Sequence, residues 1–190
     1  MTEYNFEQRK NDILKKDDKS YAGKWDGKIE NLCKRINRKS NYYTTSSCSG
    51  RILMMIDKPV KDKELFLWTN HEKTVPEDLK KEVERFSDEG SVKFKLDPPI
   101  VHVVCKTLKD AKRFLELGFK TGWKNSGIIS VGKNIVVEIR GTEKLEFPII
   151  NHGKILVSSE FLNLISEKCN QKIVKGWELI KKFENSVNLL

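Results

Sequence analysis

The sequence predicts an α+β protein with a mixed β-sheet, packed helices and a long helix near the C-terminus. Helical and strand-like apolar patterns alternate without a strict βαβ order. The G-x-G-x-x-G fingerprint of Rossmann folds is absent. Apolar side chains recur at helical spacing through residues 158–187. Because no change in composition marks a linker, we expect residues 1–190 to form a single domain without a Rossmann fold.

The first part of the chain is expected to hold a helix over residues 6–16 and a polar hinge over residues 18–23. Asp26 is of a residue type that caps helices. The positions after it carry apolar side chains every three or four residues, as one helix face requires: Ile29, Leu32, Cys33 and Ile36. We therefore expect Asp26 to cap a second helix that packs on the core.

Short apolar runs bounded by Gly, Pro and polar residues predict strands: residues 42–45, 52–56, 65–68, 92–96, 100–105, 128–131 and 135–139. A polar elbow separates the first two runs. Pro98-Pro99 separates the fourth from the fifth, because two prolines cannot both occupy one ladder. Further helices are expected at residues 76–86, with proline in the first turn, and at residues 108–117, which Gly118 ends.

The charge balance is basic and uneven. The chain has 36 Lys and Arg against 27 Asp and Glu, a net charge of +9. Residues 1–51 hold twelve basic and seven acidic residues, so this quarter carries +5. Such an excess attracts polyanions, although solvated helix faces are also rich in lysine. The apolar share of 38% excludes a disordered chain.

Cysteine and histidine usage gives no sign of a metal site or of disulfides. Four cysteines are scattered without a C-x-x-C pair, and the chain has three histidines. We therefore expect no metal and reduced, mostly buried thiols. The first residues are charged and no apolar run approaches the ~18 residues of a spanning helix, so we expect a cytoplasmic location without membrane contact.

The most unusual stretch runs from Tyr43 to Arg51 and consists mainly of small hydroxylated residues. As a loop it would turn hydroxyl and N–H groups toward a carboxylate, a phosphate or a ribose, beside the Arg51 fork. It could equally be a simple turn. Cys48 within it is either a nucleophile with a stabilised thiolate or a buried structural thiol.

Histidines and tryptophans supply further candidates. His71 follows a predicted strand end and has the residue type for proton transfer near neutral pH. His102 alternates with Val101 and Val103, which favours a core or sheet-face position. Trp123 is flanked by glycines and is a candidate platform for a base, whereas Trp177 falls on the apolar stripe of the last helix.

Several motifs in one order resemble those of the wybutosine-synthesising protein 3 family of tRNA methyltransferases. Thr44-x-Ser46-Ser47-Cys48-x-Gly50-Arg51 resembles the family signature S/T-x-S-S-C-x-G-R. The resemblance extends over essentially the whole chain, through segments that include Asp18-x-Ser20-x-x-Gly23-x-x-Asp26-x-x-Ile29, Trp68-x-x-His71, Phe94-Lys-Leu-Asp-Pro98 with His102, and Gly122-Trp-Lys-Asn-Ser-Gly-Ile128.

The resemblance implies an α/β methyltransferase unlike the doubly wound type, with S-adenosylmethionine as the methyl donor. The implied acceptor is the N-4 ring nitrogen of a demethylwyosine-type base beside the anticodon of phenylalanine tRNA. It implies catalytic roles for Asp26 and His71, either of which could be the base. The residues implied to bind the cofactor are Ser46, Ser47, Cys48, Gly50 and Arg51.

The anticodon arm of the tRNA is expected to contact basic side chains that lie close to the signature stretch in sequence: Lys34, Arg35, Arg38 and Lys39. Such phosphate contacts position a nucleic acid without reading its sequence. The alternative is a tRNA- or nucleotide-binding protein that has the fold but no turnover. The oligomeric state stays open.

Overall fold

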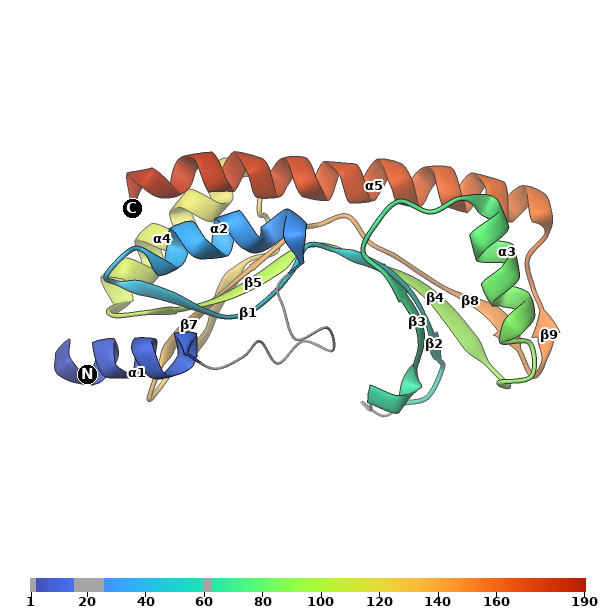
Figure 1. Ribbon diagram of the computed structural model, residues 1–190, viewed down its shortest axis with the longest axis horizontal. Coiled ribbons are helices and arrows are strands. Elements are labelled where there is room, and N and C mark those ends of the chain that lie inside the picture. The colour runs from blue at the N-terminus through green and yellow to red at the C-terminus, as the bar shows by residue number, and fades with distance from the viewer. Residues whose placement is uncertain (1–2, 16–25, 60–62) are drawn as a thin grey trace. The chain divides into compact units, whose positions relative to one another are not determined.

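The structure is a computed structural model that describes residues 3–15, 26–59 and 63–190 (Figure 1). These residues group into two compact units, each made of separate chain segments. The first unit comprises Met1–Ser49, Pro99–Thr142 and Gly176–Leu190. The second unit comprises Gly50–Pro98 and Glu143–Lys175. The predicted hinge at residues 18–23 lies outside the described residues.

The first unit is built on a four-stranded sheet in the order β1-β5-β7-β6. All of its neighbouring strands are antiparallel. The strands are β1 (Tyr42–Cys48), β5 (Ile100–Cys105), β7 (Ile135–Arg140) and β6 (Gly127–Val131).

Helices cover the two faces of this sheet differently (Figure 1). One face packs in the main core against α2 (Gly27–Asn37), α4 (Leu108–Thr121) and the end of α5 (Ser159–Ser186). The other face meets α1 (Glu3–Leu14), where Phe6 is fully buried against Tyr43 and Val104. The apolar cover described for this second face is thus confined to one part of the sheet.

The second unit contains a five-stranded sheet in the order β3-β2-β4-β8-β9, again with antiparallel neighbours. Its strands are β3 (Phe66–Asn70), β2 (Arg51–Ile56), β4 (Val92–Asp97), β8 (Leu145–Asn151) and β9 (Lys154–Ile155), and the short helix η1 (Lys63–Leu65) precedes β3.

The loop before α3 (Pro76–Arg85) is fixed to α5 within the second unit. The carbonyl oxygen of Thr74 accepts hydrogen bonds from Ser166 Oγ at 3.0 Å and Asn170 Nδ2 at 2.8 Å. Val75 then takes the N-cap position and Pro76 begins the helix, as the sequence predicts.

The α+β class, the packed helices and the long C-terminal helix are confirmed, and the strands are divided between two antiparallel sheets. The chain passes from one unit to the other at Pro98-Pro99, where the sequence already required a break in the ladder. None of the helices in the described parts of the chain combines the length and apolar character needed to cross a membrane.

The predicted end of the fourth helix at Gly118 is wrong, because α4 continues to Thr121. Gly118 is needed for close packing, since a Cβ there would lie 2.7 Å from Ile139 Cδ1 on β7. Gly122 ends the helix instead, with φ of 107° in the left-handed region.

The predicted elbow is also shorter than expected. Ser46, Ser47 and Cys48 belong to β1, and the turn is confined to Ser49 and Gly50, where Gly50 has φ of 95°. β1 and β2 lie in different sheets, so this turn is a crossing between two units and not a hairpin loop.

Candidate functional site

Thr44 to Arg51, called here the signature stretch, are rich in hydroxyl groups and form a β-strand as far as Cys48. Four of its residues pair with β5, so their backbone groups take part in a sheet ladder: Thr44, Ser46, Ser47 and Cys48. The expectation of a loop whose N–H groups converge on one point is therefore wrong for these residues. Within this strand the side chains of Thr45 and Ser46 are exposed, whereas that of Thr44 is buried.

A β-bulge at Thr45 decides which hydroxyl faces which way. Thr44 pairs with Val103 and Ser46 with His102, so Thr45 is the extra residue. Without it, Ser46 would share the core face with Thr44. With it, Ser46 and Cys48 lie on the sheet face that α1 partly covers, and Ser47 lies on the core face.

Asp26 lies at the N-cap position of α2, as predicted, but its carboxylate makes no cap hydrogen bond. Its Oδ2 atom accepts instead from the Ser49 backbone N–H at 2.9 Å and from Ser49 Oγ at 3.2 Å. The helix start therefore presents a carboxylate that fixes the end of the signature stretch. Ser49 is fully buried, so its N–H and hydroxyl groups need acceptors within the protein, and Asp26 supplies both.

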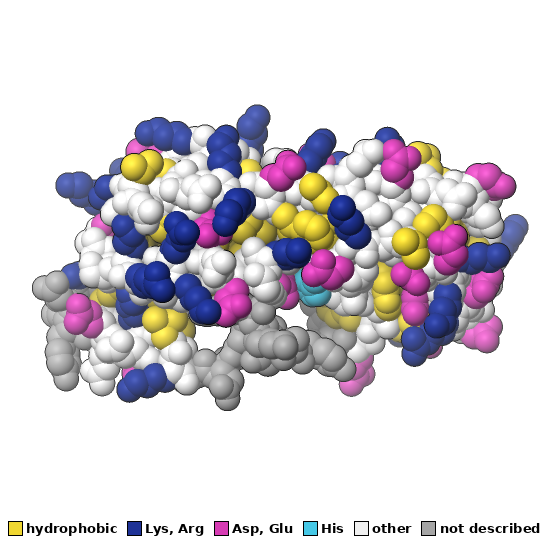
Figure 2. All heavy atoms as spheres, turned by 45° about the horizontal axis from the view of Figure 1, so that its top comes forward, with side chains coloured by type: hydrophobic (Ala, Val, Ile, Leu, Met, Phe, Trp, Pro, Cys, Tyr) yellow, Lys and Arg dark blue, Asp and Glu magenta, His cyan; other side chains and the backbone are white. Residues whose placement is uncertain are grey.

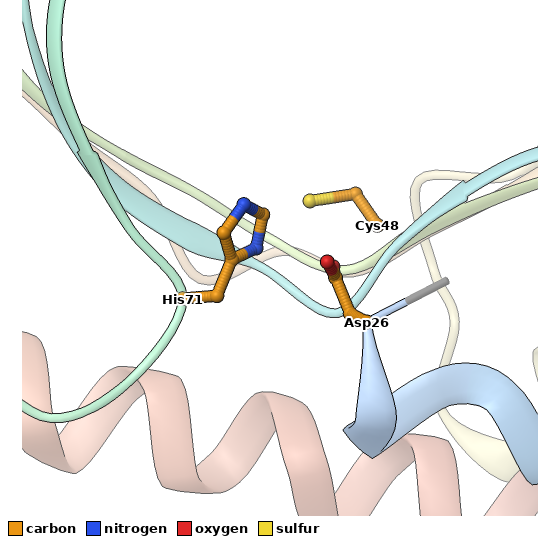
Figure 3. A group of neighbouring side chains, drawn as sticks. All are labelled: Asp26, Cys48 and His71. Atoms are coloured by element: carbon orange, nitrogen blue, oxygen red, sulfur yellow. The ribbon is translucent and has the colours of Figure 1, made fainter. Parts of the chain in front are cut away.

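His71 follows β3 and is fixed to the neighbouring residue of the same stretch. Its Nδ1 atom lies 3.1 Å from the carbonyl oxygen of Gly50. A carbonyl only accepts, so Nδ1 carries the hydrogen, and in the neutral ring Nε2 carries the lone pair. Asp26 and His71 are thus tied to the consecutive residues Ser49 and Gly50. Figure 3 draws Asp26, Cys48 and His71 with the elements from which they come.

Arg51 begins β2 and has two contacts within the second unit. Its Nε donates to Asp97 Oδ2 at 3.2 Å, and its guanidinium lies 5.0 Å from the centre of the Phe66 ring. The side chain is one-third exposed. These contacts hold the guanidinium in place through Nε, so its terminal nitrogens can form a fork toward a carboxylate.

Ser47 and Cys48 differ in their surroundings. Ser47 Oγ is buried and has no hydrogen-bond partner among the described residues. Cys48 is half-buried, whereas Cys105 and Cys169 are fully buried, and burial raises the pKa of each of these two thiols to about 12. Of the two side chains, only that of Cys48 shares the sheet face of Ser46.

His102, for which the sequence favours a core or sheet-face position, is a functional candidate in the structure. It lies on the sheet face, as its alternation predicts, and it is only half-buried. Its Nδ1 lies 2.6 Å from Ser46 Oγ and its Nε2 lies 2.8 Å from Glu138 Oε2. These contacts depend on how β1, β5 and β7 are aligned with one another, and a single sequence does not show that alignment.

The expectation that Trp123 is a platform for a base is wrong. Trp123 has no exposed surface and packs against Phe183 in the core, with ring centres 5.7 Å apart. Trp177 packs at the edge of the same core, as the helix stripe predicts, and Lys28 Nζ lies 4.5 Å from its ring centre.

The four basic residues predicted to bind RNA lie at the end of α2 and just after it. Lys34 pairs with Glu30 at 2.7 Å on the surface, and Arg38 is exposed. Lys39 donates to the carbonyl oxygen of Asn188 at 3.2 Å. Arg35 pairs at 3.1 Å with Glu184, whose side chain is only 5% exposed. Arg35 therefore also neutralises a buried carboxylate.

The net charge of the chain falls entirely on the first unit. Its segments hold 21 Lys and Arg against 12 Asp and Glu, whereas the second unit holds 15 of each. Lys and Arg side chains are numerous over the elements of the first unit on the face that Figure 2 shows. Exposed basic residues on α4 add to those of α2: Lys109, Lys112, Arg113 and Lys120.

Known proteins that resemble this chain do so over nearly its whole length, and they carry related names. The model of a protein family described as Methyltransferase TYW3 matches residues 8–189. A Thermococcus sibiricus protein named tRNA(Phe) 7-((3-amino-3-carboxypropyl)-4-demethylwyosine(37)-N(4))-methyltransferase is 35% identical, over 100% of this chain and 98% of its own. A Danio rerio protein named tRNA wybutosine-synthesizing protein 3 homolog is 35% identical over 94% of this chain and 73% of its own.

Solved structures agree with this result. A Pyrococcus horikoshii protein has a TM-score of 0.89 and 34% identity, covering 98% of this chain and 96% of its own. A hypothetical protein from Aeropyrum pernix has a TM-score of 0.75 and 26% identity, covering 86% of this chain and 98% of its own.

Proposed function

Because the chain belongs to the TYW3 methyltransferase family, we propose that it methylates the N-4 ring nitrogen of a demethylwyosine-type base beside the anticodon of phenylalanine tRNA. The methyl donor is S-adenosylmethionine. The observation that carries the proposal is the attachment of Asp26 and His71 to the consecutive residues Ser49 and Gly50 of the signature stretch.

The residues of the signature stretch fit a cofactor that offers both polar and charged groups. Ser46 is exposed on the sheet face that α1 partly covers, and Arg51 is held so that its fork can meet a carboxylate. We assign cofactor binding to Ser46, Ser47, Cys48, Gly50 and Arg51. When bound, S-adenosylmethionine supplies an electrophilic methyl group on a sulfonium.

The protein side of the mechanism requires positioning and one proton acceptor. The ring nitrogen must lose its proton as it gains the methyl group, and a neutral imidazole can accept that proton. We assign this role to His71, because the contact with Gly50 places its lone pair on Nε2. Asp26, which already accepts two hydrogen bonds from Ser49, holds the signature stretch in place.

The RNA is bound through the first unit. Its excess of nine positive charges supports electrostatic capture of a tRNA, with Lys34, Arg35, Arg38 and Lys39 as phosphate contacts. The exposed lysines of α4 extend the basic surface beyond α2.

Residues 1–190 act as one methyltransferase domain in this proposal. Both units are assembled from non-contiguous segments, which supports a single functional domain. The four free cysteines, three of them buried, support a reducing, cytoplasmic location.

The experiment that tests the cofactor assignment is thermal unfolding with and without S-adenosylmethionine. A ligand that binds only the folded state at a hundredfold excess over its Kd stabilises that state by about 2.7 kcal/mol. We expect the melting temperature to rise with S-adenosylmethionine and not with adenosine at the same concentration. An unchanged melting temperature up to saturating cofactor would refute the assignment.

Cys48 is expected not to act as a covalent nucleophile. Direct transfer to a ring nitrogen needs no methylated enzyme, so Cys48→Ser should retain measurable methyl transfer. The measurement is the single-turnover rate, with Cys169→Ser, which alters a buried thiol, as the stability control. Detection of a methyl group on Cys48 by mass spectrometry during turnover would contradict this expectation.

Removing basic side chains at the end of α2 and just after it is expected to weaken tRNA binding and to reduce its salt dependence. The slope of log affinity against log salt is negative, and it should become shallower by about 0.7 to 0.9 for each phosphate that the variant no longer binds. The variant for this test is Lys34→Gln, Arg38→Gln and Lys39→Gln, which leaves Arg35 in place for the buried Glu184. Lys80→Gln, Lys81→Gln and Lys168→Gln in the second unit form the control. An unchanged slope would show that the tRNA docks elsewhere.

A further inference from the structure

A hydrogen-bonded row crosses three strands of the first unit. Ser46 on β1 is directly opposite His102 on β5, which is directly opposite Glu138 on β7. The distances are 2.6 Å from Ser46 Oγ to His102 Nδ1 and 2.8 Å from His102 Nε2 to Glu138 Oε2. Side chains of His102 and Glu138 are 27% and 25% exposed, and Ser46 is exposed. The row therefore opens to a ligand at its serine end.

The chemistry of the partners fixes the direction of each hydrogen bond. An ionised carboxylate only accepts, so His102 Nε2 carries the hydrogen that it donates to Glu138. When the ring is neutral, its lone pair is therefore on Nδ1, which accepts the hydrogen of Ser46 Oγ. The Ser46 oxygen consequently offers only lone pairs outward, so the hydroxyl is a fixed hydrogen-bond acceptor and not a donor.

The negative charge at the end of the row decides what this acceptor prefers. Hydrogen bonds in a chain polarise one another, so the Glu138 carboxylate makes the Ser46 oxygen more electron-rich. Hydrogen bonds with a charged partner are about twice as strong as those between neutral groups. A cationic N–H donor, such as an ammonium group, suits this position better than a neutral hydroxyl does.

We propose that Ser46 binds the ammonium group of the amino-acid moiety of the cofactor, and that His102 and Glu138 are positioning residues that orient and polarise its hydroxyl. The inference rests on the proposed function, because the signature stretch is assigned there to S-adenosylmethionine. The β-bulge at Thr45 makes these hydrogen bonds possible, because it places the Ser46 side chain on the same sheet face as His102.

Binding measurements with two probes test this specificity without turnover. S-adenosylhomocysteine has the ammonium group, and 5′-methylthioadenosine has the same nucleoside without the amino-acid moiety. In calorimetric titrations, Glu138→Gln should weaken S-adenosylhomocysteine about tenfold, the loss of one charge-assisted hydrogen bond. Its affinity for 5′-methylthioadenosine should not change. Glu116→Gln, which removes an exposed carboxylate of α4, is the matched control and should change neither affinity.

The other outcomes separate the inference from the proposed function. If the wild type binds both probes and Glu138→Gln weakens both equally or neither, the inference is overturned and the methyltransferase assignment stands. If the wild type binds neither probe, both fail. Nitrogen-15 spectra of the free protein give a second readout, in which His102 should carry its hydrogen on Nε2. The Nδ1-protonated form would overturn the proposed direction of the row.

Discussion

Replacement of His71 by alanine is expected to slow methyl transfer by about 10²–10⁴-fold, the usual contribution of a positioned proton acceptor. Asp26→Ala is also expected to slow methyl transfer, through the loss of positioning. His71→Ala removes the imidazole whose lone pair is on Nε2. Asp26→Ala releases Ser49, to which the carboxylate is joined by two hydrogen bonds. The measurement is the single-turnover rate on tRNA that carries the unmethylated base, at saturating cofactor.

His152→Asn is the matched control for His71→Ala, because His152 is an exposed histidine at a turn with φ of 47°, a conformation that asparagine tolerates. It should keep the wild-type rate. Both Asp26→Ala and His71→Ala should still unfold cooperatively. Rates near that of the wild type in both variants would contradict their assignment to the catalytic step.

Trp123→Ala is expected to lower the free energy of unfolding by about 3–5 kcal/mol, because it leaves a large cavity in the core. The indole has no exposed surface and packs against Phe183. Trp123→Phe, which fills most of the volume, should cost less. Urea unfolding followed by circular dichroism is the measurement, and the exposed Phe119 on α4 provides the control Phe119→Ala, with a change within about 0.5 kcal/mol.

A role for Trp123 in stacking on a base would give a different result. Trp123→Ala would then keep the wild-type stability and lose affinity for tRNA. The sequence could not separate the two roles, because glycines on both sides of a tryptophan suit an exposed loop as well as a helix end. Gly122 ends α4, and this turn directs Trp123 into the core.

Periodicity predicted most helices and strands because their burial follows the side-chain period. α3 begins at Pro76 and β5 spans residues 100–105 as expected. The predicted helix end at Gly118 was wrong, because glycine usually breaks a helix but here serves as a small residue that packs against Ile139. Periodicity also failed in the signature stretch, where small hydroxylated residues suggest a loop although the backbone continues the ladder of β1.

The candidate site was predicted from its motifs and not from its geometry. The signature and its matching Asp26 and His71 pointed to residues whose contacts involve Ser49 and Gly50. The sequence favours only a core or sheet-face position for His102, because its neighbours in space, Ser46 and Glu138, are 56 and 36 residues away in the chain. Strand register and the bulge at Thr45 determine these contacts, and neither can be predicted from one sequence.

The most direct test of the account is methyl transfer from S-adenosylmethionine with an isotopically labelled methyl group to phenylalanine tRNA that carries the demethylated tricyclic base. After digestion to nucleosides, mass spectrometry should find one labelled methyl on that base with the wild-type protein and a much slower gain with His71→Ala. Unlabelled tRNA after incubation with folded protein and saturating cofactor would contradict the claim that this chain is the N-4 methyltransferase.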